Sequence, residues 1–69
     1  MPRYYFDLAN GRRLADPSGL VCRDDEDAKA KAEVIARQIA AEAPALTGRR
    51  VNILDLGGQE IAAVPIDEK

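Results

Sequence analysis

Two pairs of arginines, Arg12-Arg13 and Arg49-Arg50, carry the clearest chemical potential in this 69-residue chain. Guanidinium groups bind phosphates and carboxylates through charge-assisted hydrogen bonds, so two pairs on one edge of a sheet would form a basic patch. Tyr5 could stack beside such a patch, as aromatic side chains do in proteins that bind single-stranded nucleic acid. Ordinary solvated charge at turns is the simpler interpretation, because the net charge is -2 and no single-strand-binding motif accompanies the arginines.

The acidic run and the single cysteine match no pattern typical of catalysis or metal binding. The run at residues 24–27 lacks the alternating ligands, the glycine and the distant glutamate of a calcium loop, so we expect it to start a helix. Cys22 has no partner for a disulfide within the chain and, without histidine, no zinc ligand set. The acids that follow it oppose thiolate formation, which favours a buried structural cysteine. We predict no catalytic, cofactor or metal site, and no enzymatic activity.

The N-terminal third of the chain predicts short extended segments joined by turns. Residues 3–8 alternate apolar with polar or outward-facing side chains, which is typical of a half-buried strand. Asn10-Gly11 favours a tight hairpin turn, and Asp16 to Gly19 predicts a second turn in which glycine supplies the left-handed position. The expected extended segments are residues 3–8, 12–15 and 20–22.

An alanine-rich helix should follow, capped by Asp24 or Asp25. Pro44 disfavours helical geometry at Ala43, so the helix should end near that residue. The apolar side chains expected on its core face recur at spacings of three and four: Ala28, Ala32, Ile35, Ile39, Ala43 and Leu46.

A second stripe on this helix, Ala30, Val34 and Ala41, lies roughly opposite the core face. Small side chains permit close approach of another helix, so this stripe is a candidate interface for self-association. Alanine used simply as a good helix former is the alternative interpretation.

The C-terminal segments 50–56 and 59–66 flank Gly57-Gly58 and predict a hairpin. A two-residue turn would place Leu54 opposite Ile61, whereas a three-residue loop with a glycine bulge would place Ile53 opposite Ile61. Pro65 cannot donate a ladder hydrogen bond, so the last strand should lie at an edge or end there.

This order of strand, strand, short strand, helix, strand, strand predicts one α+β domain over residues 1–69. Its helix should pack across one face of an antiparallel sheet as a two-layer sandwich. Alanine makes up much of the apolar content, so the core is small, and with disulfides and zinc excluded a second subunit is the remaining way to stabilise it. The sequence has neither a signal-peptide pattern nor a membrane-spanning run, and a lone cysteine fits a cytoplasmic location.

The opening string Pro2 to Leu8, the two turns that follow, the alanine-rich helix, Gly57-Gly58 and the segment 64–66 occur together over nearly the whole chain. This combination resembles a family of short, largely alphaproteobacterial proteins known as a domain of unknown function. The resemblance implies a stand-alone cytoplasmic module and brings no activity, cofactor or catalytic residue with it.

The early hairpin, third strand and Asp-capped helix are also similar, at the level of fold, to the partial ribonuclease-H-like domain of HicB-type antitoxins. That resemblance implies a protein that neutralises a small toxin. The two-strand ending of this chain departs from the antitoxin pattern.

We therefore expect a non-enzymatic protein-interaction module that forms a homodimer, with an unidentified protein as a further possible partner, and without a cofactor or a membrane. The alternative is an accessory, antitoxin-like or nucleic-acid-binding protein that uses the four arginines, although the negative net charge disfavours nucleic acid.

Overall fold

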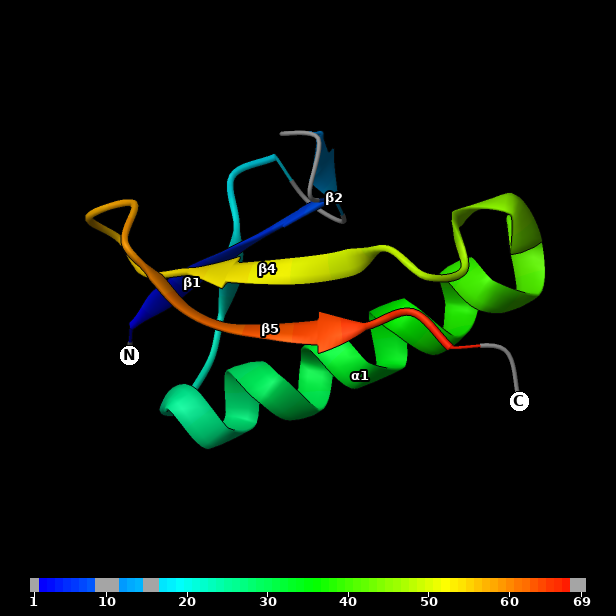
Figure 1. Ribbon diagram of the computed structural model, residues 1–69. Helices are drawn as coiled ribbons and strands as arrows, with labels where there is room; N and C mark the ends of the chain where they lie inside the picture. Colours follow the sequence, from blue (N-terminus) through cyan, green and yellow to red (C-terminus); the bar gives the residue numbers. More distant parts are fainter. Residues whose placement is uncertain (1, 9–11, 15–16, 68–69) are drawn as a thin grey trace.

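The computed structural model describes residues 2–8, 12–14 and 17–67, and in these residues one α-helix and five strands form two layers (Figure 1). Helix α1 lies along one side of an antiparallel sheet whose strand order is β2-β1-β4-β5, with β3 also paired to β1. The bounds are β1 Arg3–Leu8, β2 Arg13–Leu14, β3 Leu20–Val21, α1 Asp25–Glu42, the 3-10 helix η1 Pro44–Leu46, β4 Arg50–Leu54 and β5 Glu60–Pro65. The predicted α+β two-layer sandwich is confirmed.

Strand β1 lies in the middle of the sheet and shows the alternation expected from its sequence. Tyr4, Phe6 and Leu8 are buried, whereas the residues between them are half-buried on the opposite face. In the pairing with β4, Phe6 faces Ile53 and Leu8 faces Val51, so the buried side chains of both strands share the helix side of the sheet.

Strands β2 and β3 both lie along the edge of β1 that β4 leaves free. The backbone N–H of Leu8 donates to the carbonyl of Arg12 (2.7 Å), and the N–H of Cys22 donates to the carbonyl of Pro2 (3.0 Å). Residues an even number of positions apart in a strand direct their backbone groups to the same edge. Positions 2 and 8 are six residues apart, so β2 and β3 lie along the same edge of β1. The expected third extended segment therefore belongs to the sheet.

Gly19 permits the close approach of β3 to β1. It has a φ of +86°, and a Cβ atom at this position would lie 2.7 Å from the carbonyl oxygen of Tyr4. The turn predicted from Asp16 to Gly19 is observed at Pro17 and Ser18, and Gly19 supplies the expected left-handed conformation. Residues 10–11 and 15–16, which complete the predicted turns and the second strand, lie outside the described residues.

Helix α1 begins and ends where its capping signals predict. Asp24 is the N-cap and its side chain accepts a hydrogen bond from the N–H of Asp27, while Ala43 is the C-cap before Pro44. The buried helical side chains are all alanines: Ala28, Ala32 and Ala36. Ile35 and Ile39 pack against the same core while half-buried, as does Leu46, although Leu46 lies in η1 and not on α1. The predicted core face wrongly included Ala43, which is the C-cap, and omitted Ala36 and Ala40. Among the described residues, no helix is apolar enough over a sufficient length to cross a membrane.

The turn of the C-terminal hairpin is a three-residue loop, one of the two alternatives that the sequence leaves open. The N–H of Asp55 donates to the carbonyl of Gln59 (2.9 Å), and the N–H of Gly58 donates back to the carbonyl of Asp55 (2.9 Å). Gly58 has a φ of +85°, the left-handed conformation that such loops require at their third position.

Beyond this turn, both expected partners of Ile61 are wrong. Leu54 pairs with Glu60, but Ile53 pairs with Ala62, so Ile61 is an extra residue in a β-bulge. Strands β4 and β5 are also shorter than predicted, since the three loop residues and the flanking Asp55 and Gln59 all lie outside them. The last strand ends at Pro65 and lies at the edge of the sheet, as predicted.

The bulge is what brings the apolar residues of β5 to one face. Ile61, Val64 and Ile66 are separated by three and then two positions, so a regular strand with a period of two cannot turn all three toward the helix. With one extra residue inserted, Ile61 and Val64 pack against the core and Ile66 is fully buried.

Candidate functional site

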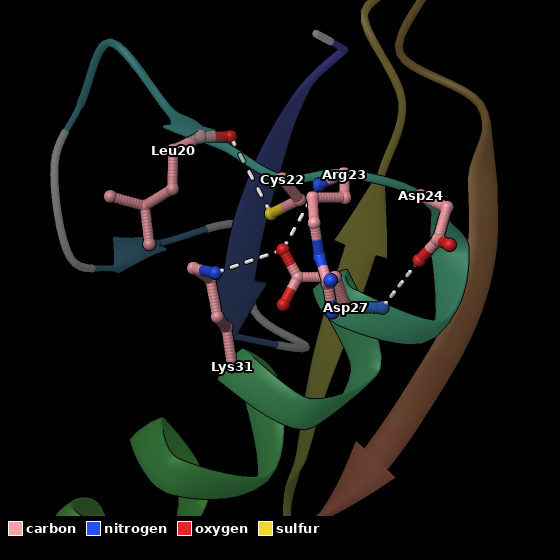
Figure 2. Close-up of polar contacts among 6 residues, drawn as sticks. All are labelled: Leu20, Cys22, Arg23, Asp24, Asp27 and Lys31. Carbon is pink, nitrogen blue, oxygen red and sulfur yellow. Dashed lines mark hydrogen bonds and ion pairs between the residues drawn. The ribbon is translucent and has the colours of Figure 1, made fainter.

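The polar cluster at the start of α1 is a helix cap (Figure 2). Asp24 Oδ1 accepts from the N–H of Asp27, and Asp27 Oδ2 accepts in turn from the N–H of Arg23, both at 2.9 Å. Lys31 Nζ lies 3.0 Å from the same Asp27 oxygen. The hydrogen bond from the Arg23 backbone, followed by that from Lys31, lowers the pKa of the Asp27 carboxyl. The acidic run therefore has the structural role that its sequence indicates.

Cys22 lies beside this cap and is buried, as predicted. Its Sγ atom is 3.7 Å from the carbonyl oxygen of Leu20. Burial raises the pKa of the thiol, the carboxylates of Asp27 and Asp24 raise it further, and Lys31 lowers it. Because the thiolate is the reactive form, this environment makes Cys22 a poor nucleophile. In the described part of the chain, no group of three or more potential metal ligands lies together.

Tyr4 ties the central strand to the helix. Its hydroxyl donates a 2.6 Å hydrogen bond to Asp25 Oδ1 in the first turn of α1. This hydrogen bond, together with burial and the nearby negative charge, raises the pKa of Tyr4 to about 12. The contact holds the helix against β1, so it serves the fold.

The structure brings both arginine pairs to one end of the sheet, where β1 ends and β4 begins. Within each pair the neighbours separate. Arg12 and Arg49 line a hollow beside the end of α1, whereas Arg13 and Arg50 lie on the face of the sheet that the helix does not cover. The predicted basic patch is therefore divided between two surfaces.

The hollow has a volume of about 320 Å³ and lies between the end of the sheet and the end of the helix. Its apolar lining comes from four elements, with Arg12, Arg49 and Glu42 as its charged groups. The apolar lining residues are Leu8, Leu14, Ile39, Ala43 and Leu46.

The uncovered face of the sheet, called here the open face, is centred on Tyr5. Arg13 lies over the Tyr5 ring, with its Cζ atom 4.6 Å from the ring centre, and also forms an ion pair with Asp7. The cross-strand partners of Asp7 are Arg13 in β2 and Asn52 in β4. These contacts hold Tyr5 and Arg13 in one orientation.

Leu54 completes the apolar centre of the open face, because it is the cross-strand partner of Tyr5. Alternation along β1 predicts that Tyr5 lies opposite the core face, whereas Leu54 is not among the surface residues predicted from the sequence. The signal available was alternation, since Val51 and Ile53 are buried and Leu54 must then point away from them. The pairing with Tyr5, however, depends on the register of β1 with β4, which the sequence does not contain.

The predicted helix interface, Ala30, Val34 and Ala41, is exposed on the outer side of α1. Val34 is its one large side chain and is 46% exposed. Charged side chains lie beside Val34. Glu33 precedes it in the sequence, and Lys31, which forms an ion pair with Asp27, lies one turn earlier on the helix.

Comparison with known protein families gives a match over nearly the whole chain. The family model described as a domain of unknown function (DUF6894) matches residues 3–67. Comparison with curated proteins and with solved structures finds no match. The fold and the surfaces described above therefore carry the functional argument.

Proposed function

Because the chain belongs to the family DUF6894, a domain of unknown function, we propose its function from geometry: it is a protein-interaction module that associates with a second copy of itself through the open face of its sheet. The observation that carries this proposal is the apolar Tyr5–Leu54 pair at the centre of a sheet face that no described element covers.

The composition of the open face fits an interface. An aromatic residue and a leucine form its centre, and Arg3, Arg13 and Asn52 surround them. Interfaces are enriched in tyrosine and arginine, and their binding energy concentrates in a few central residues inside a polar rim. Two such faces packed together would follow the aligned packing of β-sandwiches.

The small core supports association. All three buried helical side chains are alanines, so α1 contributes little apolar area for its length. Small domains buried this sparingly commonly gain stability from a second subunit. A second copy on the open face would give each sheet the layer that it lacks.

The edges of the sheet are less suited to association than its face. The backbone N–H and carbonyl of Ile66 form hydrogen bonds with Arg49 and Gly48. The backbone groups of Val64, two residues earlier, therefore also point toward β4, and those of Pro65 point to the free edge of the sheet. Proline has no N–H to offer, and the bulge at Ile61 distorts the rest of this edge. At the other edge, β2 and β3 contain two residues each. Short strands, prolines and bulges are the devices by which proteins prevent strand addition.

The charges of the open face suit contact with an identical copy. A two-fold interface brings the same patch against itself, so a patch of one sign would repel its partner. The open face carries both signs: Arg3, Arg13 and Arg50 are basic, and Asp7 and Glu60 are acidic.

Sedimentation velocity over a concentration series tests the proposal with a matched pair of variants. The parent chain should form a dimer, and Leu54→Asn should weaken dimerisation by at least about tenfold, since central residues carry most of an interface's energy. Val34→Asn on the helix stripe is the control and should leave the dimer unchanged, with circular dichroism verifying that both variants fold. A parent chain that stays monomeric at millimolar concentration, or a Leu54→Asn variant that dimerises normally, contradicts the proposal.

A second candidate function rests on the four arginines at one end of the sheet, of which Arg13 and Arg50 share the open face with Tyr5, while Arg12 and Arg49 line the hollow on the other side. The alternative function is therefore an accessory, antitoxin-like or nucleic-acid-binding protein, and the nucleic-acid branch is the one that can be tested directly. Titration of a labelled single-stranded oligonucleotide should then give binding that weakens steeply with salt, because phosphate contacts release counterions. Absence of binding at low salt excludes this candidate.

A further inference from the structure

We propose that Arg3 and Glu60 determine how two copies of this chain face each other. Ion pairs between Arg3 of one copy and Glu60 of the other fix the partner on the open face with its strands running in the same direction as those of the first. This orientation rests on the self-association proposed above, and it follows from the order of side chains across the sheet.

One row of residues crosses the open face through its apolar centre. Tyr5 pairs with Leu54, and Leu54 pairs in turn with Glu60 in the edge strand β5. On the other side of Tyr5, the antiparallel pairing of β1 with β3 places Gly19 opposite its ring. A Cβ atom on Gly19 would lie 3.0 Å from the Cε2 atom of Tyr5. The row therefore runs from Gly19 at one edge of the sheet to Glu60 at the other.

Arg3 places a positive charge at the Gly19 end of this row. Its Nη1 atom donates to the carbonyl oxygens of Ser18 (3.0 Å) and Gly19 (3.4 Å). These carbonyls are neutral, so they fix the guanidinium beside Tyr5 without neutralising its charge. Within the described residues, neither Arg3 nor Glu60 forms an ion pair.

The charges and side chains of the row are complementary to the same row read in reverse. From one edge to the other they are positive, aromatic, aliphatic and negative: Arg3, Tyr5, Leu54 and Glu60. Arg13, the other cation beside Tyr5, is already paired with Asp7 and adds no unpaired charge to the row.

A two-fold axis between two sheets packed face to face can run along the strands or across them. An axis along the strands reverses the row, so that Tyr5 of each copy lies on Leu54 of the other and opposite charges meet at both ends. An axis across the strands keeps the order of the row, so that each residue lies on its own copy and like charges meet at both ends. Because like charges across an interface disfavour binding, the row selects the axis along the strands.

The two ion pairs select the orientation, whereas the apolar centre contributes most of the affinity. Glu60 is exposed and Arg3 is half-buried, so both lie in the rim around Tyr5 and Leu54. Ion pairs in such a rim contribute little free energy of their own, but they disfavour arrangements that bring like charges together.

Charge reversals followed by sedimentation velocity test this orientation. Arg3→Glu and Glu60→Arg should each weaken dimerisation about tenfold, because either change places like charges at both ends of the row. The double variant Arg3→Glu/Glu60→Arg should return to within about twofold of the parent affinity, because opposite charges then meet again.

Arg37→Glu is the matched control, since it changes the net charge as Arg3→Glu does but lies at an exposed position of α1. It should leave the dimer unchanged, and circular dichroism verifies that every variant folds. If a variant does not fold, isotope-filtered NOEs of the parent chain decide the orientation: contacts between Leu54 methyl groups and the Tyr5 ring of the other copy support it.

Three results would overturn the orientation while self-association stands. Single reversals that leave the dimer unchanged indicate the axis across the strands, where each reversal only replaces one like-charge contact by another. A double variant no tighter than the single variants shows that Arg3 and Glu60 do not meet. Intermolecular NOEs between Leu54 methyl groups, without any from Leu54 to Tyr5, have the same meaning. A parent chain that stays monomeric overturns both proposals.

Discussion

Tyr4 and Tyr5 are neighbours in the sequence and lie on opposite faces of the same strand, in opposite circumstances. Tyr4 is 4% exposed, packs in the core and hydrogen-bonds to Asp25 of the helix. Tyr5 is half-buried on the open face, where its contacts are with Arg13 and its cross-strand partner Leu54. In β1, a residue that stabilises the fold is therefore adjacent in the sequence to one that is available for contact with other molecules.

This division extends to the whole sheet. On the helix side, Phe6, Leu8, Val51 and Ile53 are fully buried, and the buried side chains of the helix beneath them are alanines. On the other side, the same strands present arginines and an ion pair around a small apolar centre. Mutations on the two faces should accordingly affect different properties, stability for one and association for the other.

Two single-residue deletions, one in β4 and one in β5, should differ most in their effect on folding. Asn52 and Ala63 are cross-strand partners. Loss of Asn52 exchanges the faces of one end of β4, which has no bulge to absorb the shift, so this variant should fail to fold. Loss of Ala63 can be absorbed by removing the bulge at Ile61, after which Val64 and Ile66 still face the helix. Circular dichroism and thermal unfolding of the two variants check this, and equal loss of structure in both would show that the bulge does not set the faces of β5.

Truncating one aromatic residue on each face should give the next largest difference. Phe6→Ala creates a cavity at a fully buried site and should lower the free energy of unfolding by about 3–5 kcal/mol. Tyr5→Ala removes a partly exposed ring and its contact with Arg13, and should cost about 1 kcal/mol or less in the monomer. Urea denaturation at a protein concentration below that of association measures both. If Tyr5→Ala lowered the free energy of unfolding as much as Phe6→Ala, Tyr5 would be a core residue and the two faces of the sheet would not differ in this way.

Alkaline pH should destabilise the helix side through Tyr4. The pKa of Tyr4 is about 12 in the folded chain, above the ordinary value of 10, so the folded state retains a proton that the unfolded state releases. The associated stability is complete below pH 10 and is lost as the pH rises from about 10 toward 12. Urea denaturation across this range should show the fall in the parent chain and in Tyr5→Phe but a smaller one in Tyr4→Phe. If Tyr4→Phe and the parent chain lose stability in parallel, the hydrogen bond to Asp25 does not produce the effect.

The elements that could be predicted from the sequence are those specified by neighbouring residues. Alternation from Tyr4 to Leu8 indicates β1 with its correct bounds and faces, and Asp24 and Pro44 indicate both ends of α1. Gly57-Gly58 indicates the turn of the hairpin, although the sequence leaves a two-residue turn and a three-residue loop open. In each case the physical signal acts over a few residues and does not depend on which other segment is nearby.

The features that could not be predicted depend on pairing between distant segments. The bulge at Ile61 allows Ile61, Val64 and Ile66 all to pack against the core. Burial of all three side chains is favourable only because α1 covers that face of the sheet. The uneven spacing of these three residues was the available hint.

The candidate surfaces were missed for the same reason. The Tyr5–Leu54 pair depends on the register of β1 with β4, and the hollow between Arg12 and Arg49 depends on where α1 ends relative to the sheet. The helix stripe at Val34 could be identified from the sequence because its helical spacing is local.

The most direct test of the open face as an interface is an isotope-filtered NOE experiment on an equimolar mixture of labelled and unlabelled chains. It detects only contacts between protons of different copies. Our account predicts intermolecular NOEs from the methyl groups of Leu54 and from the ring of Tyr5. Intermolecular NOEs confined to the methyl groups of Val34 on the helix, with none from Leu54 or Tyr5, would contradict it.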